Sequence, residues 1–243
     1  MRRVLITGGG TGIGRAIARS FAASGDHVTI CGRRLGPLQE TAQETAQGSQ
    51  MQCRVADVTD EGAVRDLFDT GFDVVIANAG GGVAGKVRHV SLADWNATLA
   101  VNLTGTFLLF REALRNMGPG GRLIAIASTA SLKGGASIPA YAAAKHGILG
   151  LVRSVALDVA GKGLTCNAVC PGFVDTDLAE AAISAVQKRF DLTREAALAE
   201  VISDNPMGRL IAPEEVVAAV QFLASAGASM VNGHALSVSG GEI

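Results

Sequence analysis

The sequence predicts an α/β fold in which one doubly wound parallel sheet of about seven strands carries helices on both faces. Short runs that are apolar nearly throughout alternate with longer amphipathic stretches along the chain. Strands covered on both faces should lack polar alternation, and parallel strands need crossover segments that are usually helical. The chain has 243 residues and is 48% hydrophobic and 18% charged, which is typical of a domain with a large core.

The apolar runs mark the expected strands, at residues 4–7, 28–31, 52–55, 74–77, 123–127, 165–169 and 235–238. Amphipathic periodicity predicts helices at residues 13–23, 38–47, 61–70, 92–116, 140–161 and 213–224. This alternation is typical of right-handed crossovers that place helices on both faces of a sheet. Because no Pro- or Ser-rich linker and no internal repeat divides residues 1–243, we expect a single dinucleotide-binding and catalytic domain.

One segment interrupts the alternation of strands and helices. Between Pro171 and Pro213 no strand pattern occurs, and residues 178–190 and 193–203 have helical patterns. An insertion after the carboxyl end of a strand lies where open α/β sheets bind ligands. We therefore interpret the segment at about residues 175–212 as a substrate lid, with a packing appendage as the alternative.

Charge and hydropathy limit the partners that this chain can have. A formal net charge of −1 gives no reason to expect nucleic acid or an anionic membrane. No apolar run approaches the roughly 20 residues that a spanning helix needs. The three apolar residues at 4–6, just before glycine begins, are too few for a secretory signal. These features predict a cytoplasmic protein.

The four cysteines, Cys31, Cys53, Cys166 and Cys170, predict free and mostly buried thiols. A disulfide framework is not expected in a chain of this size with its own core. The closest pair, Cys166 and Cys170, has no further cysteine or histidine nearby that would complete a zinc site. We expect no metal centre.

Residues 7–14 read TGGGTGIG and lie between the first expected strand and the first expected helix. Glycines let a backbone approach a pyrophosphate closely, and the helix amino terminus then offers free N–H groups and a positive dipole end. A Gly-Lys-Ser/Thr sequence, which a P-loop would need, is absent. The segment therefore predicts a dinucleotide-binding loop.

The second strand leads into Gly32-Arg33-Arg34 rather than into an acidic residue. NAD sites usually carry an acid here, which binds the ribose 2′-hydroxyl. Arginine instead matches a phosphate in charge and geometry. Arg33, and less strongly Arg34, thus predict a preference for NADP(H), with NAD(H) as the second candidate. The alternative is that both arginines are solvated residues at a helix start.

Two further strand ends face the same expected site. Asp57 and Val58 follow the third strand, and the Asp57 carboxylate could accept a hydrogen bond from an adenine amino group or cap the next helix. The small residues of Asn78-Ala79-Gly80 end the fourth strand and suit a backbone that lies against the cofactor.

Tyr141, the only tyrosine, stands four residues before Lys145 in a predicted helix, so that both share one face. An ammonium beside a phenol favours the phenolate, and we expect it to lower the tyrosine pKa from about 10. The phenol could then exchange a proton with an alcohol oxygen. Ser128, which closes the fifth strand, could orient a substrate carbonyl.

Asn102 lies inside a long helical pattern and is followed closely by Gly105. Both residue types are poor in the middle of a helix, so we expect a local kink there. Asn102 could hold a water in a proton relay to Lys145, or it could be a tolerated exposed residue.

Taken together, these motifs resemble the short-chain dehydrogenase/reductase family, in its single-domain branch of about 250 residues, over essentially the whole chain. The resemblance implies a Rossmann-like fold and a catalytic tetrad of Asn102, Ser128, Tyr141 and Lys145. It also implies cofactor contacts, which involve Gly8, Thr11, Gly12, Ile13, Gly14, Arg33, Arg34, Asp57, Val58, Asn78, Ala79, Gly80, Tyr141, Lys145, Pro171, Gly172, Val174 and Thr176.

Some of these implied contacts are specific. Lys145 would bind the nicotinamide ribose, Pro171, Gly172 and Val174 the nicotinamide, and Thr176 the carboxamide and diphosphate region. The family pattern usually reads Asn-Asn-Ala-Gly, whereas Ala77 stands at its first position here. The second Asn is kept, so we expect little functional loss.

The implied reaction is reduction of a carbonyl by hydride from NADPH, or the reverse oxidation of a secondary alcohol. The lid and residues 236–241 resemble members that act on 3-oxoacyl or 3-hydroxyacyl thioesters of coenzyme A or a carrier protein. Lys86, Arg88, Lys188, Arg189 and Arg194 could meet phosphates of such a substrate or be ordinary surface charges. The alternatives are a free ketone, steroid, sugar or polyol, and a non-catalytic NADP(H)-sensing module. The family's pairing of long helices, here 92–116 and 140–161, implies a homodimer or homotetramer.

Overall fold

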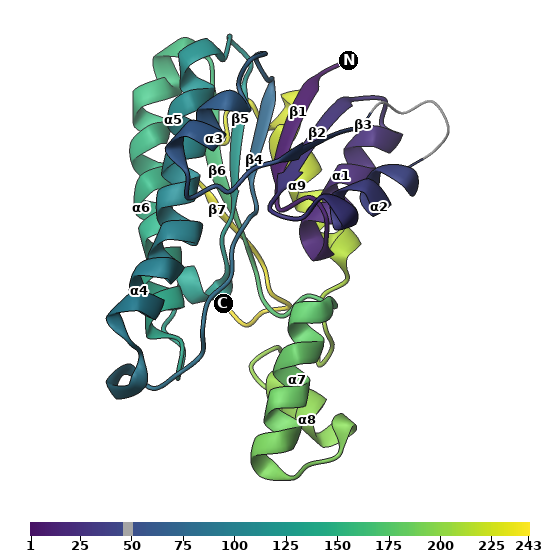
Figure 1. The fold of residues 1–243 in the computed structure, drawn as a ribbon, viewed down its shortest axis with the longest axis vertical. Helices are drawn as coiled ribbons and strands as arrows, with labels where there is room; N and C mark the ends of the chain where they lie inside the picture. The colour runs from purple at the N-terminus through teal and green to yellow at the C-terminus, as the bar shows by residue number, and fades with distance from the viewer. Residues whose placement is uncertain (46–50) are drawn as a thin grey trace.

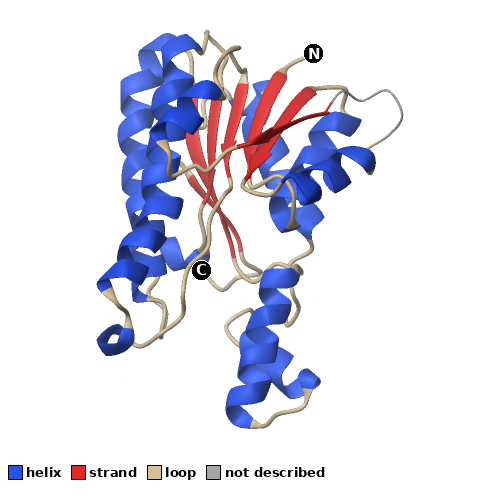
Figure 2. Ribbon diagram, viewed as in Figure 1, coloured by secondary structure: helices blue, strands red, loops and turns tan. Residues whose placement is uncertain are grey.

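All seven expected strands form, and they build one parallel sheet in the order β3-β2-β1-β4-β5-β6-β7 (Figures 1 and 2). The structure is a computed structural model and describes residues 1–45 and 51–243. The strands are β1 (Arg3–Thr7), β2 (His27–Gly32), β3 (Met51–Val55), β4 (Val74–Ala77), β5 (Arg122–Ile126), β6 (Thr165–Pro171) and β7 (Ala235–Val238). The predicted fold class is confirmed.

The strand order reverses at β1, which pairs with β2 on one side and with β4 on the other. The chain first winds outward from β1 to β3, then crosses back and winds outward again through β4 to β7. Loops that leave β1 and β4 therefore diverge, and they open a crevice outside the carboxyl ends of the strands. This is where the predicted site residues gather.

Helices cover both faces of the sheet (Figure 1). On one face lie α1 (Gly12–Ala23), α2 (Leu35–Gln43) and α9 (Pro213–Ala224), and on the other lie α3 (Glu61–Asp66), α4 (Leu92–Leu99), α5 (Gly105–Asn116) and α6 (Pro139–Val159). Short 3₁₀ turns are η1 (Val87–His89), η3 (Thr129–Ser131), η4 (Ala160–Lys162) and η5 (Ala226–Ala228). A π-helical turn, η2 (Ala100–Thr104), lies between α4 and α5.

Two cores follow from the alternation of side chains along the buried strands. Val4 and Ile6 of β1 face α1, where they pack with Phe21, whereas Leu5 between them faces the other layer and packs with Leu109 of α5. All three β1 side chains have no exposed surface. Because both faces of the strands are covered, the absence of polar alternation in the sequence is explained.

Three of the expected helices differ most from the sequence prediction. The stretch at 92–116 is divided by the π turn at 100–104, so the expected kink is confirmed. The helix expected at 38–47 begins at Leu35, because Pro37 is tolerated in a first turn, and it ends at Gln43; residues 46–47 lie outside the described residues. The helix expected at 61–70 ends at Asp66, where tighter bonds from Leu67 N to Val64 O and from Phe68 N to Arg65 O close the last turn.

Two helices, α7 (Asp177–Phe190) and α8 (Arg194–Val201), form the segment that was expected without strands. They pack on each other and project beyond the carboxyl end of the sheet (Figure 1). No helix among the described residues is both long and apolar enough to cross a membrane. The four cysteines are free, and Cys31, Cys166 and Cys170 are buried, as the sequence predicted.

Candidate active site

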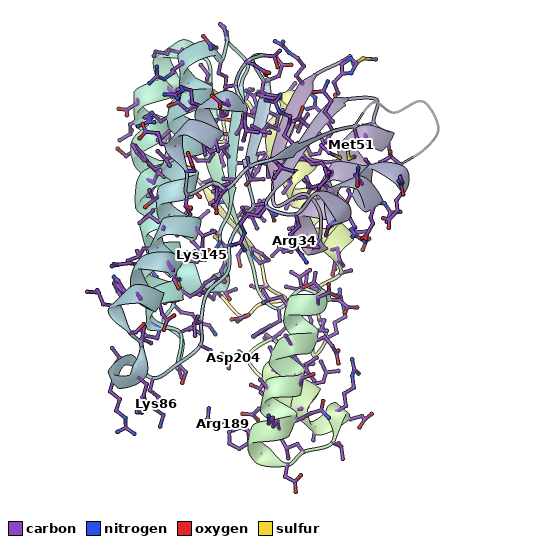
Figure 3. All side chains as sticks on the ribbon, viewed as in Figure 1. Arg34, Met51, Lys86, Lys145, Arg189 and Asp204 are labelled. Carbon is purple, nitrogen blue, oxygen red and sulfur yellow. The ribbon has the colours of Figure 1, made fainter. Side chains whose placement is uncertain are left out.

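The predicted site residues come together at the carboxyl edge of the sheet, around the switch between β1 and β4. Figure 3 places Arg34 on the α2 side of this edge and Lys145 on the α6 side. The glycine-rich loop, the ends of β2 to β6 and the start of α6 all contribute to it. The site therefore has a nucleotide-facing half on β1, β2 and β3 and a second half on β4, β5, β6 and α6.

The glycine-rich loop is folded tightly against the start of β4. Gly8 has a φ of 67°, in the left-handed region that favours glycine. A side chain on Gly14 would meet the carbonyl oxygen of Gly8 and would come within 2.5 Å of Asn78 Nδ2. Glycine at position 14 lets the first turn of α1 approach the loop, and the free N–H groups of this turn are available to a phosphate.

Thr7 joins the glycine-rich loop to β4. It is the first residue of the motif at 7–14, but it was not among the predicted site residues. Its hydroxyl accepts hydrogen bonds from the backbone N–H groups of Asn78 and Ala79, both at 3.0 Å. In return, Asn78 Nδ2 donates to the Thr7 carbonyl at 2.9 Å. Asn78 thus holds the two strand ends at the switch point together.

A cavity of about 190 Å³ lies beside this loop. Many of the predicted cofactor residues line it, namely Gly8, Thr11, Arg33, Arg34, Asp57, Val58, Ala79 and Gly80. Gly12 and Thr176 instead border a second cavity with Thr11, and the two residues face each other, with a side chain on Gly12 only 3.4 Å from Thr176 Cγ2. The glycine-rich loop therefore borders both cavities.

Arg33 and Arg34 are exposed at the cavity, and no ion pair between described residues involves either of them. The Asp57 carboxylate accepts hydrogen bonds from Thr59 N at 2.9 Å and from Thr59 Oγ1 at 2.8 Å. The Thr59 backbone, and to a smaller degree the charge of Arg33, hold the pKa of Asp57 below its ordinary value. Asp57 and Arg33, which both line the cavity, therefore attract each other electrostatically.

Lys145 is buried, with 4% of its surface exposed, and its Nζ donates to the carbonyl of Ile126 at 2.8 Å. Burial lowers the pKa of Lys145 to about 8. The same Nζ lies 5.5 Å from the centre of the Tyr141 ring. The two side chains therefore share one face of α6, as the four-residue spacing predicted.

The predicted lowering of the Tyr141 pKa is wrong. The pKa of Tyr141 is raised above its ordinary value, because burial of the phenol outweighs the opposing interaction with the Ser128 side chain. The Lys145 Nζ donates its hydrogen bond to the Ile126 carbonyl. In this arrangement Tyr141 holds its proton at neutral pH.

Ser128 is held close to Tyr141 at the end of β5. Its hydroxyl caps the 3₁₀ turn η3 by accepting a hydrogen bond from Ala130 N at 3.1 Å. The Ser128 side chain also interacts with the Tyr141 phenol, whose pKa it lowers against the effect of burial. The serine, the phenol and the ammonium thus lie together, although they come from a strand end and a helix.

Asn102 is fully buried in the π-helical turn. Its Nδ2 donates to the carbonyls of Gly81 at 2.6 Å and Thr98 at 2.8 Å, and its Oδ1 accepts from Gly81 N at 3.3 Å. A side chain on Gly80 would lie 2.6 Å from Asn102 Oδ1 and 3.6 Å from Lys145 Nζ. Asn102 therefore holds the loop after β4 against Lys145, and the predicted water relay stays a prediction.

The end of β6 supplies the remaining predicted cofactor residues. After Pro171 and Gly172, the backbone of Val174 pairs with Ile211 in a parallel bridge. Thr176, the N-cap of α7, donates from its hydroxyl to the Val174 carbonyl at 3.1 Å. This pairing fixes the base of the projecting helices beside the predicted nicotinamide contacts.

An ion cluster around Lys133 was not predicted from the sequence. Lys133 Nζ lies 2.6 Å from Asp204 Oδ2 and 2.9 Å from Glu242 Oε1. A side chain on Gly172 would come within 2.7 Å of the other Glu242 oxygen. The cluster joins the segment between Ser128 and Tyr141, the end of the projecting segment and the carboxyl-terminal residues. No local pattern signals it, because its members lie far apart in the chain.

The basic residues expected near a thioester divide into two groups. Arg194 pairs with Glu180 at 2.7 Å, and Arg88 donates to the ring of His89 at 2.9 Å. Lys86, Lys188 and Arg189 take part in no ion pair between described residues. In Figure 3, Lys86 lies on the α4 side and Arg189 on the projecting helices. No group of three or more metal-ligating side chains occurs within residues 1–45 and 51–243.

Comparison with known proteins gives matches over nearly the whole chain. A family model described as enoyl-(acyl carrier protein) reductase matches residues 8–242. The "Granaticin polyketide synthase putative ketoacyl reductase 1" of Streptomyces violaceoruber is 34% identical and is covered over 91% of its length by 98% of this chain. The D-beta-hydroxybutyrate dehydrogenase of Cupriavidus necator is 33% identical, with 100% of this chain matched to 98% of that protein.

Solved structures agree with these matches. A variant of actinorhodin polyketide ketoreductase, solved with NADPH, superimposes with a TM-score of 0.93 at 31% identity. The alignment covers 99% of this chain and 97% of that one. The likeness therefore extends over the sheet, the helices on both faces and the projecting segment.

Proposed function

Because the chain belongs to the short-chain dehydrogenase/reductase family of NAD(P)-dependent oxidoreductases, which interconvert carbonyls and alcohols, we propose that its cofactor is NADP(H) and its substrate a 3-oxoacyl or 3-hydroxyacyl thioester. The observation that carries this proposal is the juxtaposition of Ser128, Tyr141 and Lys145 at the same edge of the sheet as the cavity that the glycine-rich loop and Arg33 line.

The residues around the crevice fit a dinucleotide phosphate. Five of the seven residues at 8–14 are glycines, and a group added at Gly14 would collide with the Gly8 carbonyl, so the loop backbone lies close to the α1 amino terminus. Arg33 stands at the adenosine end without an ion-pair partner among the described residues, where a ribose 2′-phosphate would supply one. NADPH supplies the hydride when it is bound there. Lys145, Pro171, Gly172, Val174 and Thr176 would hold its nicotinamide end.

The chain's own residues provide the proton and the orientation of the substrate. Tyr141 is protonated at neutral pH, as an ordinary phenol with a pKa of about 10 would be, and burial raises its pKa further, so it can donate a proton to the oxygen of a carbonyl under reduction. Ser128, whose side chain interacts with this phenol, can donate a hydrogen bond to the same oxygen. The nearby Lys145 cation stabilises the negative charge left on Tyr141. Asn102 keeps the Gly80–Gly81 backbone in place.

The names of the relatives and the basic residues at the site support the thioester. The granaticin and actinorhodin proteins are named as polyketide ketoreductases or ketoacyl reductases. Lys86 and Arg189, on opposite sides of the site, could meet phosphates of a long carrier arm. The projecting helices α7 and α8 would act as the lid over such an arm. A free ketone, steroid, sugar or polyol is the alternative substrate, and a non-catalytic NADP(H) sensor is the alternative of another class.

The test is a panel of initial rates with NADPH and with NADH. We expect acetoacetyl-CoA with NADPH to give the highest kcat/KM. Acetoacetate and a cyclic ketone test for free carbonyl substrates, and crotonyl-CoA tests for the enoyl reduction that the family description names. Faster turnover of a free ketone would overturn the thioester assignment. NADPH binding without turnover of any carbonyl would support a sensor instead.

Arg33→Ser is expected to raise the KM for NADPH by about 10- to 100-fold and to leave the KM for NADH within about twofold. The reason is that a charge-assisted hydrogen bond to the 2′-phosphate, of about 1.5–3 kcal/mol, is lost only with the phosphorylated cofactor. Steady-state kinetics with both cofactors measure this difference. Arg34→Ser provides the comparison, with a smaller increase expected. Equal increases for NADPH and NADH in Arg33→Ser would contradict the assignment.

The pH dependence of reduction should follow Lys145. Its pKa of about 8 lies below the ordinary 10.5, so Lys145 carries its charge below pH 8 and loses it above, while Tyr141 stays protonated over this range. We expect kcat/KM, which reports the free enzyme, to be level from pH 6.5 to about 8 and then to fall about tenfold per unit. A Lys145→Arg variant keeps the charge and should move the fall to higher pH. A level wild-type profile up to pH 10 would contradict this role.

The predicted homodimer or homotetramer and the cytoplasmic location stay predictions. Sedimentation at micromolar concentration would decide the first of these, and a monomer would contradict it.

A further inference from the structure

Arg15, a residue of α1 outside every predicted contact with cofactor or substrate, makes a double contact with the glycine-rich loop. Its Nε donates to the carbonyl of Gly10 at 3.1 Å, and its Nη2 donates to the same oxygen at 2.9 Å. The chain therefore uses a charged, forked side chain to fix the direction of one peptide group in this loop.

The direction of that peptide group matters for phosphate binding. In a trans peptide the carbonyl and the following N–H point in opposite directions. Because the Gly10 carbonyl is held toward Arg15, the Thr11 N–H is directed away from it. Thr11 is the N-cap of α1, lines the cavity that contains Arg33, and precedes the free N–H groups of the first turn.

The same guanidinium also reaches α2. Arg15 Nη2 lies 3.2 Å from Glu40 Oε2, and Arg15 Nη1 lies 3.4 Å from Glu44 Oε1. The first turn of α2 packs on the loop directly, since a side chain on Gly10 would come within 3.0 Å of Pro37 Cβ. Arg34 is the N-cap of α2, so α2 begins directly after the two arginines.

We propose that Arg15 is a positioning residue that aligns the diphosphate-binding loop with the Arg33-Arg34 turn, and thereby sets the affinity for the phosphorylated dinucleotide. This inference rests on the proposed NADP(H) function. The carboxylates of Glu40 and Glu44 are 63% and 40% exposed, so their ion pairs contribute little to stability. These ion pairs act by fixing the position of the Arg15 guanidinium between α1, the glycine-rich loop and α2.

Arginine is required for this arrangement. Nε and Nη2 bind one carbonyl while Nη1 and Nη2 reach two carboxylates, and the planar fork presents these donors together. A lysine ammonium is a point charge on a flexible stem and cannot span the three acceptors in one geometry. Arg19, one turn further along α1, pairs with Glu44 at 3.3 Å, and its hydrogen bonds do not include the glycine-rich loop. It is therefore a matched control.

The test compares R15Q, R15K and R19Q by titration with NADPH and NADH and by steady-state kinetics. We expect R15Q to weaken NADPH binding about tenfold, as loss of a charged hydrogen bond implies, with kcat at saturating cofactor within about twofold of wild type. R15K should fail to restore the affinity, and R19Q should bind within about twofold of wild type. If Arg15 were needed only for folding, R15Q would lower the melting temperature, and it would not raise the KM for NADPH while leaving kcat unchanged.

The double variant R15Q/R33S tests the alignment itself. If Arg15 positions the Arg33 turn, R15Q should weaken NADPH binding less in the R33S background than in wild type. For NADH the effect of R15Q should be the same in both backgrounds. Additive effects on NADPH binding would overturn the proposed alignment.

Other outcomes separate the inference from the function on which it rests. Wild-type protein that binds no NADPH would contradict the proposed function. Wild-type binding together with equal affinities of R15Q and R19Q would overturn only the role of Arg15. If R15Q does not fold, E40Q/E44Q releases the guanidinium from α2 but keeps its loop contact. A weakening of NADPH binding by about threefold or more would then support the inference, and unchanged binding would overturn it.

Discussion

Replacement of Tyr141 by phenylalanine is expected to lower kcat for carbonyl reduction by about 10³-fold while NADPH affinity stays within about twofold of wild type. Phenylalanine keeps the buried ring and its packing, including the position 5.5 Å from Lys145 Nζ, and removes only the hydroxyl. Because Tyr141 is protonated at neutral pH and sits beside Ser128, its loss removes the proton donor and one of the two donors to the carbonyl oxygen.

The measurement is kcat with acetoacetyl-CoA, together with a binding titration of NADPH. Ser128→Ala should also lower kcat, and the double variant Tyr141→Phe with Ser128→Ala should be little worse than Tyr141→Phe, because residues that act as a unit are not additive. Ser131→Ala is the matched control. Ser131 lies in the same 3₁₀ turn, and its hydroxyl has no hydrogen-bond partner within the described part of the chain. Near-normal turnover of Tyr141→Phe would refute the mechanism.

Gly14→Ala is expected to destabilise the protein by about 3 kcal/mol and to abolish NADPH binding at micromolar concentration. The added methyl group would meet the Gly8 carbonyl oxygen and come within 2.5 Å of Asn78 Nδ2, two groups that hold the end of β1 to the end of β4. A backbone carbonyl cannot move aside as the end of a flexible side chain can. The loop must therefore shift, and its N–H groups shift with it.

Chemical denaturation and an NADPH titration measure the two effects of Gly14→Ala. Gly150→Ala is the control, since Gly150 is exposed in the middle of α6, an added Cβ there meets nothing within 4 Å and the residue has an ordinary φ. Alanine there should raise the free energy of unfolding by up to about 1 kcal/mol, because it favours the helix more than glycine does. If Gly14→Ala were as stable as Gly150→Ala, the close approach of Gly14 to the Gly8 carbonyl would not constrain the loop.

Much of the fold could be predicted because its signals are local. The β1 strand reads as an uninterrupted apolar run because Val4 and Ile6 face one core and Leu5 the other. The kink at Asn102 could be predicted from residues that are poor in helices, and it is a π turn. Helix ends were less predictable. The early end of α3 at Asp66 depends on tight turns beyond it that no periodic pattern marks.

The candidate site could be predicted in part for the same reason. Glycines at 8–14 and the spacing of Tyr141 and Lys145 are contiguous patterns, and they identify the residue types and the elements that carry them. The direction of the Tyr141 pKa shift could not be predicted from the spacing of Tyr141 and Lys145. Proximity of an ammonium suggested a lowered pKa for Tyr141, whereas burial raises it and Lys145 instead donates to Ile126.

The sequence by itself determined the parallel α/β architecture, the candidate dinucleotide loop and the candidate reactive side chains, because periodicity and short motifs depend only on neighbouring residues. Only the tertiary structure decided the raised pKa of Tyr141, the cluster of Lys133 with Asp204 and Glu242, and the contact of Arg15 with Gly10, Glu40 and Glu44. These depend on burial and on distances between segments that folding brings together. Solvent exclusion and contact between distant residues do not exist until the chain has packed.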